Sequence, residues 1–88
     1  MEGANLQEEE WAMPETIVNL TRAQLNSNLV ELMDPADTAA LVRAAKNRLG
    51  KFKPTAVSVQ FRGNGAIVEF TITAPAQLKE DDVRAALA

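Results

Sequence analysis

The clearest pattern in the chain is an alternation of apolar and polar residues on either side of Asn64-Gly65. The apolar members, in chain order, are Val57, Val59, Phe61, Val68, Phe70 and Ile72. A period of two is typical of strands with one buried face, and Asn-Gly is the preferred dipeptide of a two-residue type I′ turn. We therefore predict a β-hairpin that turns at Asn64-Gly65.

The length of the turn decides the register of this hairpin. A two-residue turn places Gly63 opposite Ala66, so that Phe61 meets Val68 and every large apolar residue faces another. A three-residue turn would instead set Gln60 against Val68, and polar residues against apolar ones throughout. We predict the first register, which directs both strand phenylalanines toward a core and leaves a polar opposite face.

One strand and a short helix are predicted before the hairpin. Residues 16–20 alternate as a strand does. Thr21 and Gln24 then fit a capping box, which predicts a helix over residues 22–33. An extended chain is the alternative here, because residues 26–28 (Asn-Ser-Asn) are poor helix formers.

The strongest helical pattern follows this segment. It begins after a cap at Asp34 or Asp37, continues to about Leu49, and ends at Gly50 as its C-cap. A last helix with an acidic first turn is predicted over residues 80–87. This order of elements predicts one α+β domain, a small two-layer sandwich of a three-stranded sheet and two or three helices.

Charge divides the chain into a short acidic segment and a weakly basic body. Residues 1–15 carry five Glu and no Lys or Arg, whereas residues 16–88 carry nine basic and seven acidic side chains. The segment lacks sustained periodicity, which predicts a flexible tail in front of a domain over residues 16–88. Trp11 and Met13 are its apolar exceptions. We expect them either to cover an edge of the core or to dock on a partner.

The residue inventory argues against catalysis. The chain has no His and no Cys, and its two serines, Ser27 and Ser58, lack any signature of a nucleophile. Gly63-Asn64-Gly65 lacks the lysine and the following helix of a phosphate-binding loop, and residues 80–82 lack the spacing of a calcium loop. We therefore predict a protein that is not an enzyme and that needs neither cofactor nor metal.

Five cations lie between Arg43 and Lys53, at the end of the main predicted helix. The phosphate backbone of a nucleic acid would be attracted to them. However, the phenylalanines that could stack on bases stand at the alternate strand positions that are predicted to face the core. Nucleic acid is therefore a disfavoured partner. As a further hypothesis, the acidic tail shields these cations until a partner displaces it.

The N-terminus is polar and acidic, and no apolar run approaches the length that spans a bilayer. These features predict neither a signal peptide nor a membrane contact. A cytoplasmic location is the default expectation.

Residues 37–74 resemble SEA-type modules, in which a helix precedes a hairpin of the form Val-x-Val-x-x-x-x-Gly-Ser-Val-Val-Val-x-Phe. The corresponding stretch here is Val-Ser-Val-Gln-Phe-Arg-Gly-Asn-Gly-Ala-Ile-Val-Glu-Phe, from Val57 to Phe70. The resemblance implies a ferredoxin-like sandwich. It does not imply self-cleavage, because Ala66 replaces the serine of the Gly-Ser turn.

A ferredoxin-like sandwich adds a last strand after its final helix, and the sequence given ends at Ala88. We therefore expect a sheet edge that is free for a partner or for a second copy. The favoured function is a non-catalytic protein-interaction, adaptor or assembly module that can self-associate into a homodimer. The alternatives are a small inhibitor or regulator of a larger enzyme, and a nucleic-acid accessory domain. The candidate partner-contact residues are Trp11, Met13, Arg43, Lys46, Lys51, Lys53 and Arg62.

Overall fold

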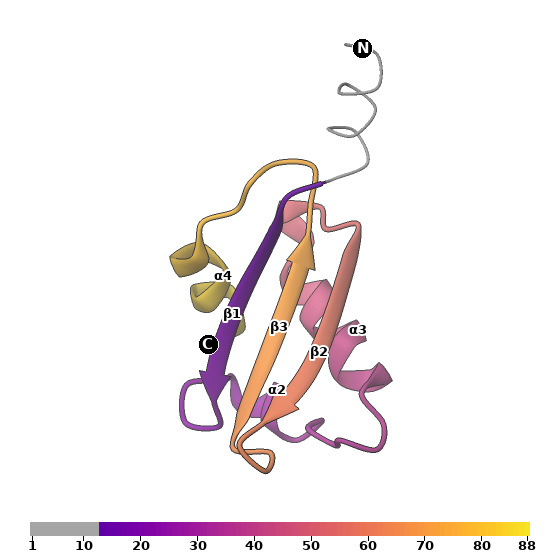
Figure 1. Ribbon diagram of the computed structural model, residues 1–88, viewed down its shortest axis with the longest axis vertical. Helices are drawn as coiled ribbons and strands as arrows, with labels where there is room; N and C mark the ends of the chain where they lie inside the picture. Colours follow the sequence, from indigo (N-terminus) through magenta and orange to yellow (C-terminus); the bar gives the residue numbers. More distant parts are fainter. Residues whose placement is uncertain (1–12) are drawn as a thin grey trace.

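The computed structural model describes residues 13–88 (Figure 1). Its sheet has three antiparallel strands in the order β1-β3-β2. The strands are β1 (Glu15–Thr21), β2 (Ala56–Arg62) and β3 (Ile67–Thr73). The helices are α2 (Ser27–Val30), α3 (Ala39–Arg48), the 3-10 helix η1 (Gly50–Phe52) and α4 (Glu80–Leu87). The helices cover one face of the sheet, which confirms the predicted α+β sandwich.

Within residues 13–88, the element order and strand order fit a ferredoxin-like sandwich as far as its second main helix, α4. The helix α3 packs on the β2 side of the sheet and α4 on the β1 side (Figure 1). Within residues 13–88, no helix has the length and the apolar character needed to cross a membrane.

The core lies between the sheet and the helices. Its buried residues come from alternate positions of β1 and β3, from α2, α3 and α4, and from the turns after β1 and α3: Val18, Leu20, Leu25, Leu29, Leu41, Ala45, Leu49, Val68, Phe70, Ile72, Val83 and Leu87. Because β3 is the central strand, its inward residues are covered on both flanks, and Phe70 is 0% exposed. The inward residues of β2 are only half-buried, whereas those of the other edge strand, β1, are buried.

The predicted register of the hairpin is confirmed. Phe61 pairs with Val68 and Val59 with Phe70. The predicted two-residue loop is wrong, however, because β2 ends at Arg62 and four residues precede β3.

The longer loop has a local cause. Gly63, Asn64 and Gly65 all adopt positive φ angles, of 59°, 57° and 87°. Two overlapping turns result, closed by Gly65 N donating to Arg62 O at 3.1 Å and Ala66 N to Gly63 O at 3.1 Å. The left-handed conformation at Gly63 therefore ends the strand one residue earlier than a two-residue turn requires.

Alanine substitution at Gly65, compared with alanine substitution at Gly50 outside the loop, measures the backbone strain of the hairpin loop. An added Cβ would meet no atom within 4 Å at either position, but only Gly65 has a positive φ. We expect Gly65→Ala to lower the free energy of unfolding by about 1–2 kcal/mol, and Gly50→Ala to leave it unchanged or raise it slightly. Urea unfolding of both variants tests this, and equal shifts would contradict it.

The predicted helix over residues 22–33 is wrong. The capping-box contact does form, with Thr21 N donating to Gln24 Oε1 at 2.9 Å, but only a single turn follows. Asn26 then takes a non-helical conformation, and its Oδ1 accepts a bond from Asn28 N at 3.0 Å. The chain therefore restarts at Asn26, and α2 covers four residues only.

The main helix starts after the alternative predicted cap, Asp37, and ends near Leu49 as predicted, but the roles predicted for Asp34 and Gly50 are wrong. Asp34 closes a separate turn by accepting from Ala36 N at 2.9 Å, and α3 begins only after Asp37 accepts from Ala39 N at 3.2 Å. Gly50 is not a C-cap, because the chain continues into η1. The left-handed residue that ends this segment is Lys53, with a φ of 54°.

Candidate functional site

The sheet has two edge strands, β1 and β2, and their backbone groups are the candidate binding groups. The hydrogen-bond ladder between β1 and β3 shows which backbone groups of β1 face outward. Ala74 N donates to Pro14 O at 3.3 Å, so the β1–β3 ladder continues through this pair. Because hydrogen-bonded and non-bonded pairs alternate in an antiparallel ladder, the even-numbered residues of β1 bond to β3. The odd-numbered residues of β1 therefore present their N–H and C=O groups at the outer edge.

The outer edge of β1 is partly occupied by the protein itself. Arg84 Nη1 donates to Asn19 O at 2.7 Å, while its Nη2 contacts Glu80 Oε1 at 3.3 Å. At the end of the strand, Thr21 N donates to the Gln24 side chain, and Thr21 O accepts from Gln24 N at 3.0 Å and Leu25 N at 3.1 Å. A strand added to β1 would have to displace these contacts.

The outer edge of β2 has a different character. The even-numbered groups of β3 bond to β1, so its odd-numbered groups bond to β2. Thr73 O also accepts from Thr55 N at 2.7 Å, so the carbonyl of this odd-numbered residue faces the β2 side. The backbone groups of Val57, Val59 and Phe61 therefore face outward. Among residues 13–88, no side chain or loop donates to or accepts from them.

The side chains along the β2 edge are apolar on one face and polar on the other. Val57, Val59 and Phe61 point toward the helices, where α3 packs against β2, and remain half-buried. Ser58 and Gln60 lie exposed on the open face of the sheet. The β2 edge thus combines free hydrogen-bonding groups with apolar surface that is incompletely covered.

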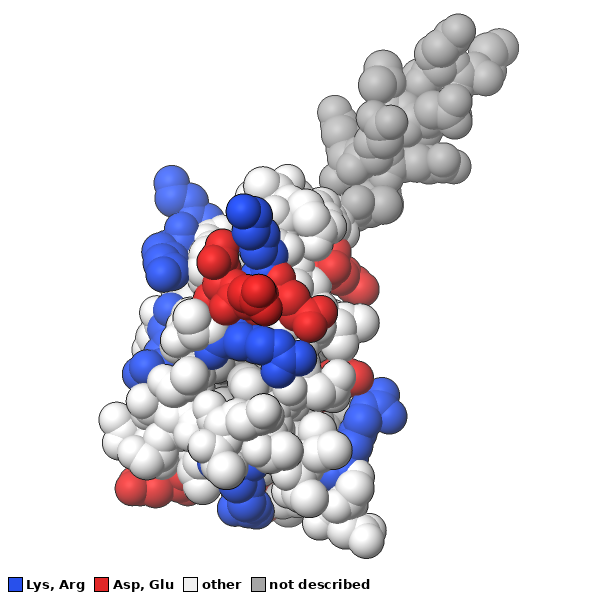
Figure 2. All heavy atoms as spheres, turned by 90° about the vertical axis from the view of Figure 1, so that its left-hand side faces the viewer, with Lys and Arg blue, Asp and Glu red and all other residues white. Residues whose placement is uncertain are grey.

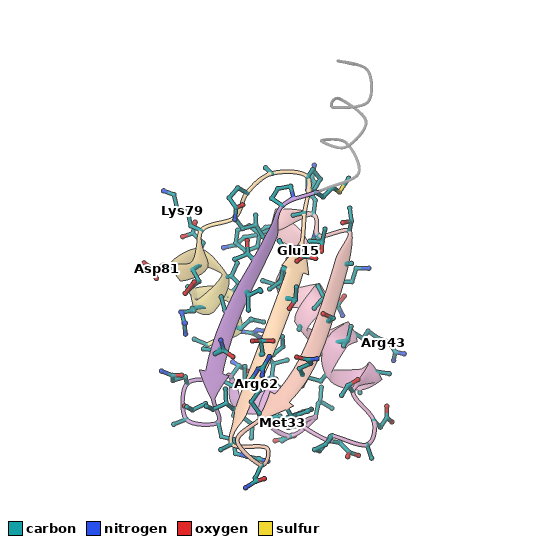
Figure 3. All side chains as sticks on the ribbon, viewed as in Figure 1. Glu15, Met33, Arg43, Arg62, Lys79 and Asp81 are labelled. Atoms are coloured by element: carbon teal, nitrogen blue, oxygen red, sulfur yellow. The ribbon has the colours of Figure 1, made fainter. Side chains whose placement is uncertain are left out.

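Four of the predicted contact cations lie on the α3 and β2 side of the molecule, and we call them the basic rim: Arg43, Lys46, Lys51 and Lys53. All four are exposed. Figure 3 shows Arg43 projecting from α3 on the outer side of β2. Lys51 Nζ lies 5.2 Å from the centroid of the Phe52 ring, a cation–π contact that holds this cation at the end of the helix.

The structure separates Arg62 from the basic rim. Arg62 lies on the open face of the sheet, where its guanidinium donates to both carboxylate oxygens of Glu69 at 3.2 Å and to Gln60 Oε1 at 3.3 Å (Figure 3). Its grouping with the other cations as a contact residue is therefore not supported by their placement.

The structure bears on only one of the two candidate contact residues in the acidic segment, Trp11 and Met13. Trp11 lies outside the described residues. Met13 is 38% exposed, and its Sδ accepts from Thr55 Oγ1 at 3.7 Å, next to the start of β2. Glu15, which the sequence assigned to the tail, is the first residue of β1.

Acidic side chains gather on the opposite side of the molecule from the basic rim. Glu80, Asp81 and Asp82 form the first turn of α4, which packs beside β1. Figure 2 shows the acidic side chains of this side between Lys and Arg side chains. Three carboxylates therefore lie beside β1 among cations, whereas the four cations of the basic rim lie on the β2 side.

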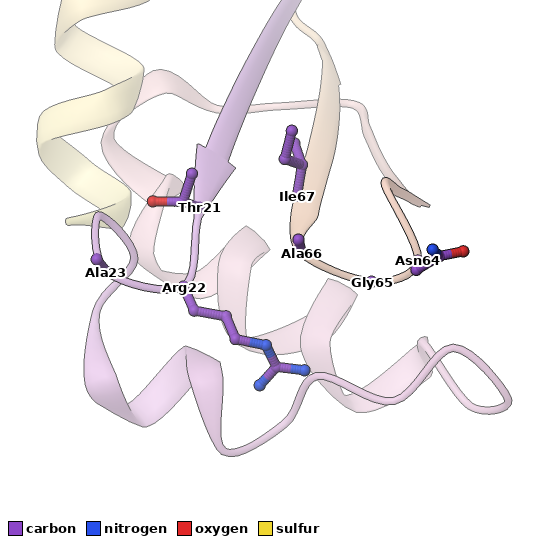
Figure 4. A pocket seen from close by; sticks show the side chains of 7 residues that line it. All are labelled: Thr21, Arg22, Ala23, Asn64, Gly65, Ala66 and Ile67. Atoms are coloured by element: carbon purple, nitrogen blue, oxygen red, sulfur yellow. The ribbon is translucent and has the colours of Figure 1, made fainter.

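A shallow hollow of about 670 Å³ lies at the end of the sheet (Figure 4). Its lining comes from the turn after β1 and from the hairpin loop: Thr21, Arg22, Ala23, Asn64, Gly65, Ala66 and Ile67. Arg22 is its single charged residue. The amides of Gly65 and Ala66 already donate to backbone carbonyls. These groups supply neither a nucleophile nor an acid–base pair.

The chemistry available elsewhere is equally limited. Ser58 lies on the open face of β2 and Ser27 at the start of α2, and in the described part of the chain no three acidic side chains gather as a metal site. The arrangement is suited to binding through the β2 edge. Comparisons with protein-family models, with curated proteins and with solved structures found no match to this chain.

Proposed function

We propose that this protein is a non-catalytic interaction module that binds a segment of another protein as an additional strand on β2. The observation that carries the proposal is the difference between the two edges. Arg84 and Gln24 already bond to the edge of β1, whereas the outward groups of Val57, Val59 and Phe61 have no bonding partner among residues 13–88. Unpaired edges of this kind accept extended segments by backbone hydrogen bonding.

The same geometry accommodates two of the alternatives. A small inhibitor of a larger enzyme would hold a segment of that enzyme on β2, and a self-associating module would hold the β2 of a second copy. A nucleic-acid accessory domain is supported less well, because both faces of the sheet lack an exposed aromatic residue among residues 13–88. Phe70 is buried, and Phe52 and Phe61 are half-buried.

A pair of proline variants tests the proposal. Val59→Pro and Ile17→Pro each place a proline at the centre of an edge strand, at a residue whose N–H faces outward. Proline removes the donor and hinders an added strand, while bonds to the central strand remain. In affinity capture from cell extract with quantitative mass spectrometry, we expect Val59→Pro to lose at least about tenfold of the retained partner and Ile17→Pro to retain it.

The far-UV circular dichroism of both variants must match that of the original chain before capture is compared. Equal retention by the two variants would contradict binding at β2. Loss with Ile17→Pro alone would assign the function to β1. Light scattering of the original chain then separates a second copy from a different protein, because self-association raises the mass with concentration.

A further inference from the structure

We infer that the β2 edge recognises an extended acidic segment, with an apolar residue at its centre and Asp or Glu at its flanks. This inference rests on the proposed function and names the chemistry of its partner. It follows from two features of the same side of the molecule: the incompletely covered apolar face of β2, and the basic rim formed by Arg43, Lys46, Lys51 and Lys53.

The apolar requirement comes from strand geometry. Residues directly opposite one another in an antiparallel pair have their side chains on the same face of the sheet. The partner residue opposite Val59 therefore points toward α3, against the half-buried side chains of Val57 and Phe61. An apolar side chain here removes more surface from water, whereas the next residue along lies on the open face beside Ser58 or Gln60.

The acidic requirement comes from the placement of charge. The residues from 43 to 53 carry five basic and no acidic side chains. Arg48 Nε donates to Ala86 O of α4 at 2.9 Å and so faces away from β2, which leaves the four cations of the basic rim. None of the four forms an ion pair within residues 13–88. They are therefore available to a partner's carboxylates.

The basic rim also discriminates between occupants. Its like charges oppose a basic segment on β2. A twofold pairing of β2 with the β2 of a second copy is antiparallel, so the Lys53 end of each strand would lie beside the far end of the other strand. The rim therefore favours acidic over basic segments, and the mass of the protein at rising concentration decides on a second copy. The acidic residues Asp34 and Asp37 lie in the connection before α3, which runs near the end of β2 rather than its start (Figure 1). We therefore expect the partner's carboxylates to favour the Lys53 end of the strand.

Two blocked heptapeptides provide the test: Glu-Glu-Thr-Val-Thr-Glu-Glu and its counterpart with Lys in place of each Glu. Each is titrated into the full chain at low salt, and the amide NMR shifts of Val57, Val59 and Phe61 are followed. We expect the acidic peptide to bind at least about tenfold more tightly than the basic one, with the difference falling as salt is raised. Equal affinities would overturn the inference and leave strand addition intact, whereas no shift at β2 with either peptide would count against both.

A matched pair of charge variants shows whether position or net charge is responsible. Lys46→Glu with Lys53→Glu reverses two cations of the basic rim, and Arg22→Glu with Lys79→Glu makes the same change in net charge elsewhere. We expect only the first variant to lose the preference for the acidic peptide. Equal losses in both variants would overturn the inference.

Measurements on the protein without added peptide would detect two other occupants of the β2 edge. If the amides of Val57, Val59 and Phe61 are already protected from hydrogen exchange, and Glu8→Gln, Glu9→Gln and Glu10→Gln together remove that protection, the chain's own acidic segment is the occupant. A mass that doubles with concentration identifies a second copy. Either result would overturn assignment of the edge to a partner's segment.

Discussion

Phe70→Ala is expected to lower the free energy of unfolding by about 3–5 kcal/mol, the largest stability loss from any single truncation in this core. Phe70 is 0% exposed and lies at the middle of the central strand, opposite Val18 on β1 and Val59 on β2. Truncation leaves a cavity between a three-stranded sheet and its helices, and few neighbours can collapse into it. Domains of this size have roughly 4–11 kcal/mol of stability in total, so much of it would be lost.

Ile17→Ala is the matched control for Phe70→Ala. Ile17 is also a large apolar residue at the middle of a strand, but it lies on the open face and is 47% exposed. We expect its truncation to change the free energy of unfolding by less than about 1 kcal/mol. Urea unfolding of the two variants gives both values, and comparable losses would show that the open face is covered in solution.

Ser58→Pro is expected to destabilise the protein by at least about 2 kcal/mol more than Val59→Pro. The two residues are adjacent on β2, but the backbone of Ser58 bonds to Thr71 on β3, whereas that of Val59 faces outward. Proline at 58 removes a ladder hydrogen bond and places its ring against the central strand. The side chains would suggest the reverse order, because Ser58 is exposed and Val59 is half-buried.

This comparison tests the geometry on which the proposed function depends. Thermal or urea unfolding gives the two stabilities, and hydrogen exchange of the original chain gives an independent check. The amides of Ser58 and Gln60 should exchange slowly and those of Val57 and Val59 rapidly. If Val59→Pro is the more disruptive substitution, the outward and inward groups of β2 have been assigned the wrong way round.

Several local elements were predictable because their causes are local. Alternation along β2 and β3, together with the Asn64-Gly65 dipeptide, predicted the hairpin register, since a shift of one residue would expose every core side chain. The last helix was predictable from an acidic first turn followed by Val83 and Leu87 at helical spacing.

Other local predictions were wrong where two local signals competed. Thr21 and Gln24 formed their predicted contact, but Asn26 provided a second cap that restarted the chain. At the hairpin, the sequence Gly63-Asn64-Gly65 permits left-handed conformations at three successive residues, so the turn widened without changing the register. Composition alone does not rank such competing conformations, because their energies differ by little.

The candidate site depended on contacts between distant parts of the chain. The sequence indicated a free sheet edge but not which edge it is. Among residues 13–88, Arg84 distinguishes the two edges, since it bonds to Asn19 across 65 positions, and no local pattern predicts that contact. Its spacing of four residues from Glu80 is that of an ordinary ion pair along a helix.

The sequence by itself determined the fold class, the register of the hairpin and the inward face of each strand, because hydrophobic burial acts on periodicities that are visible along the chain. The tertiary structure alone showed that Arg84 and Gln24 occupy part of the β1 edge, and it separated Arg62 from the basic rim while placing that rim beside β2. The physical reason is that strand order and helix placement set the neighbours of each edge, and these depend on the packing of the whole domain.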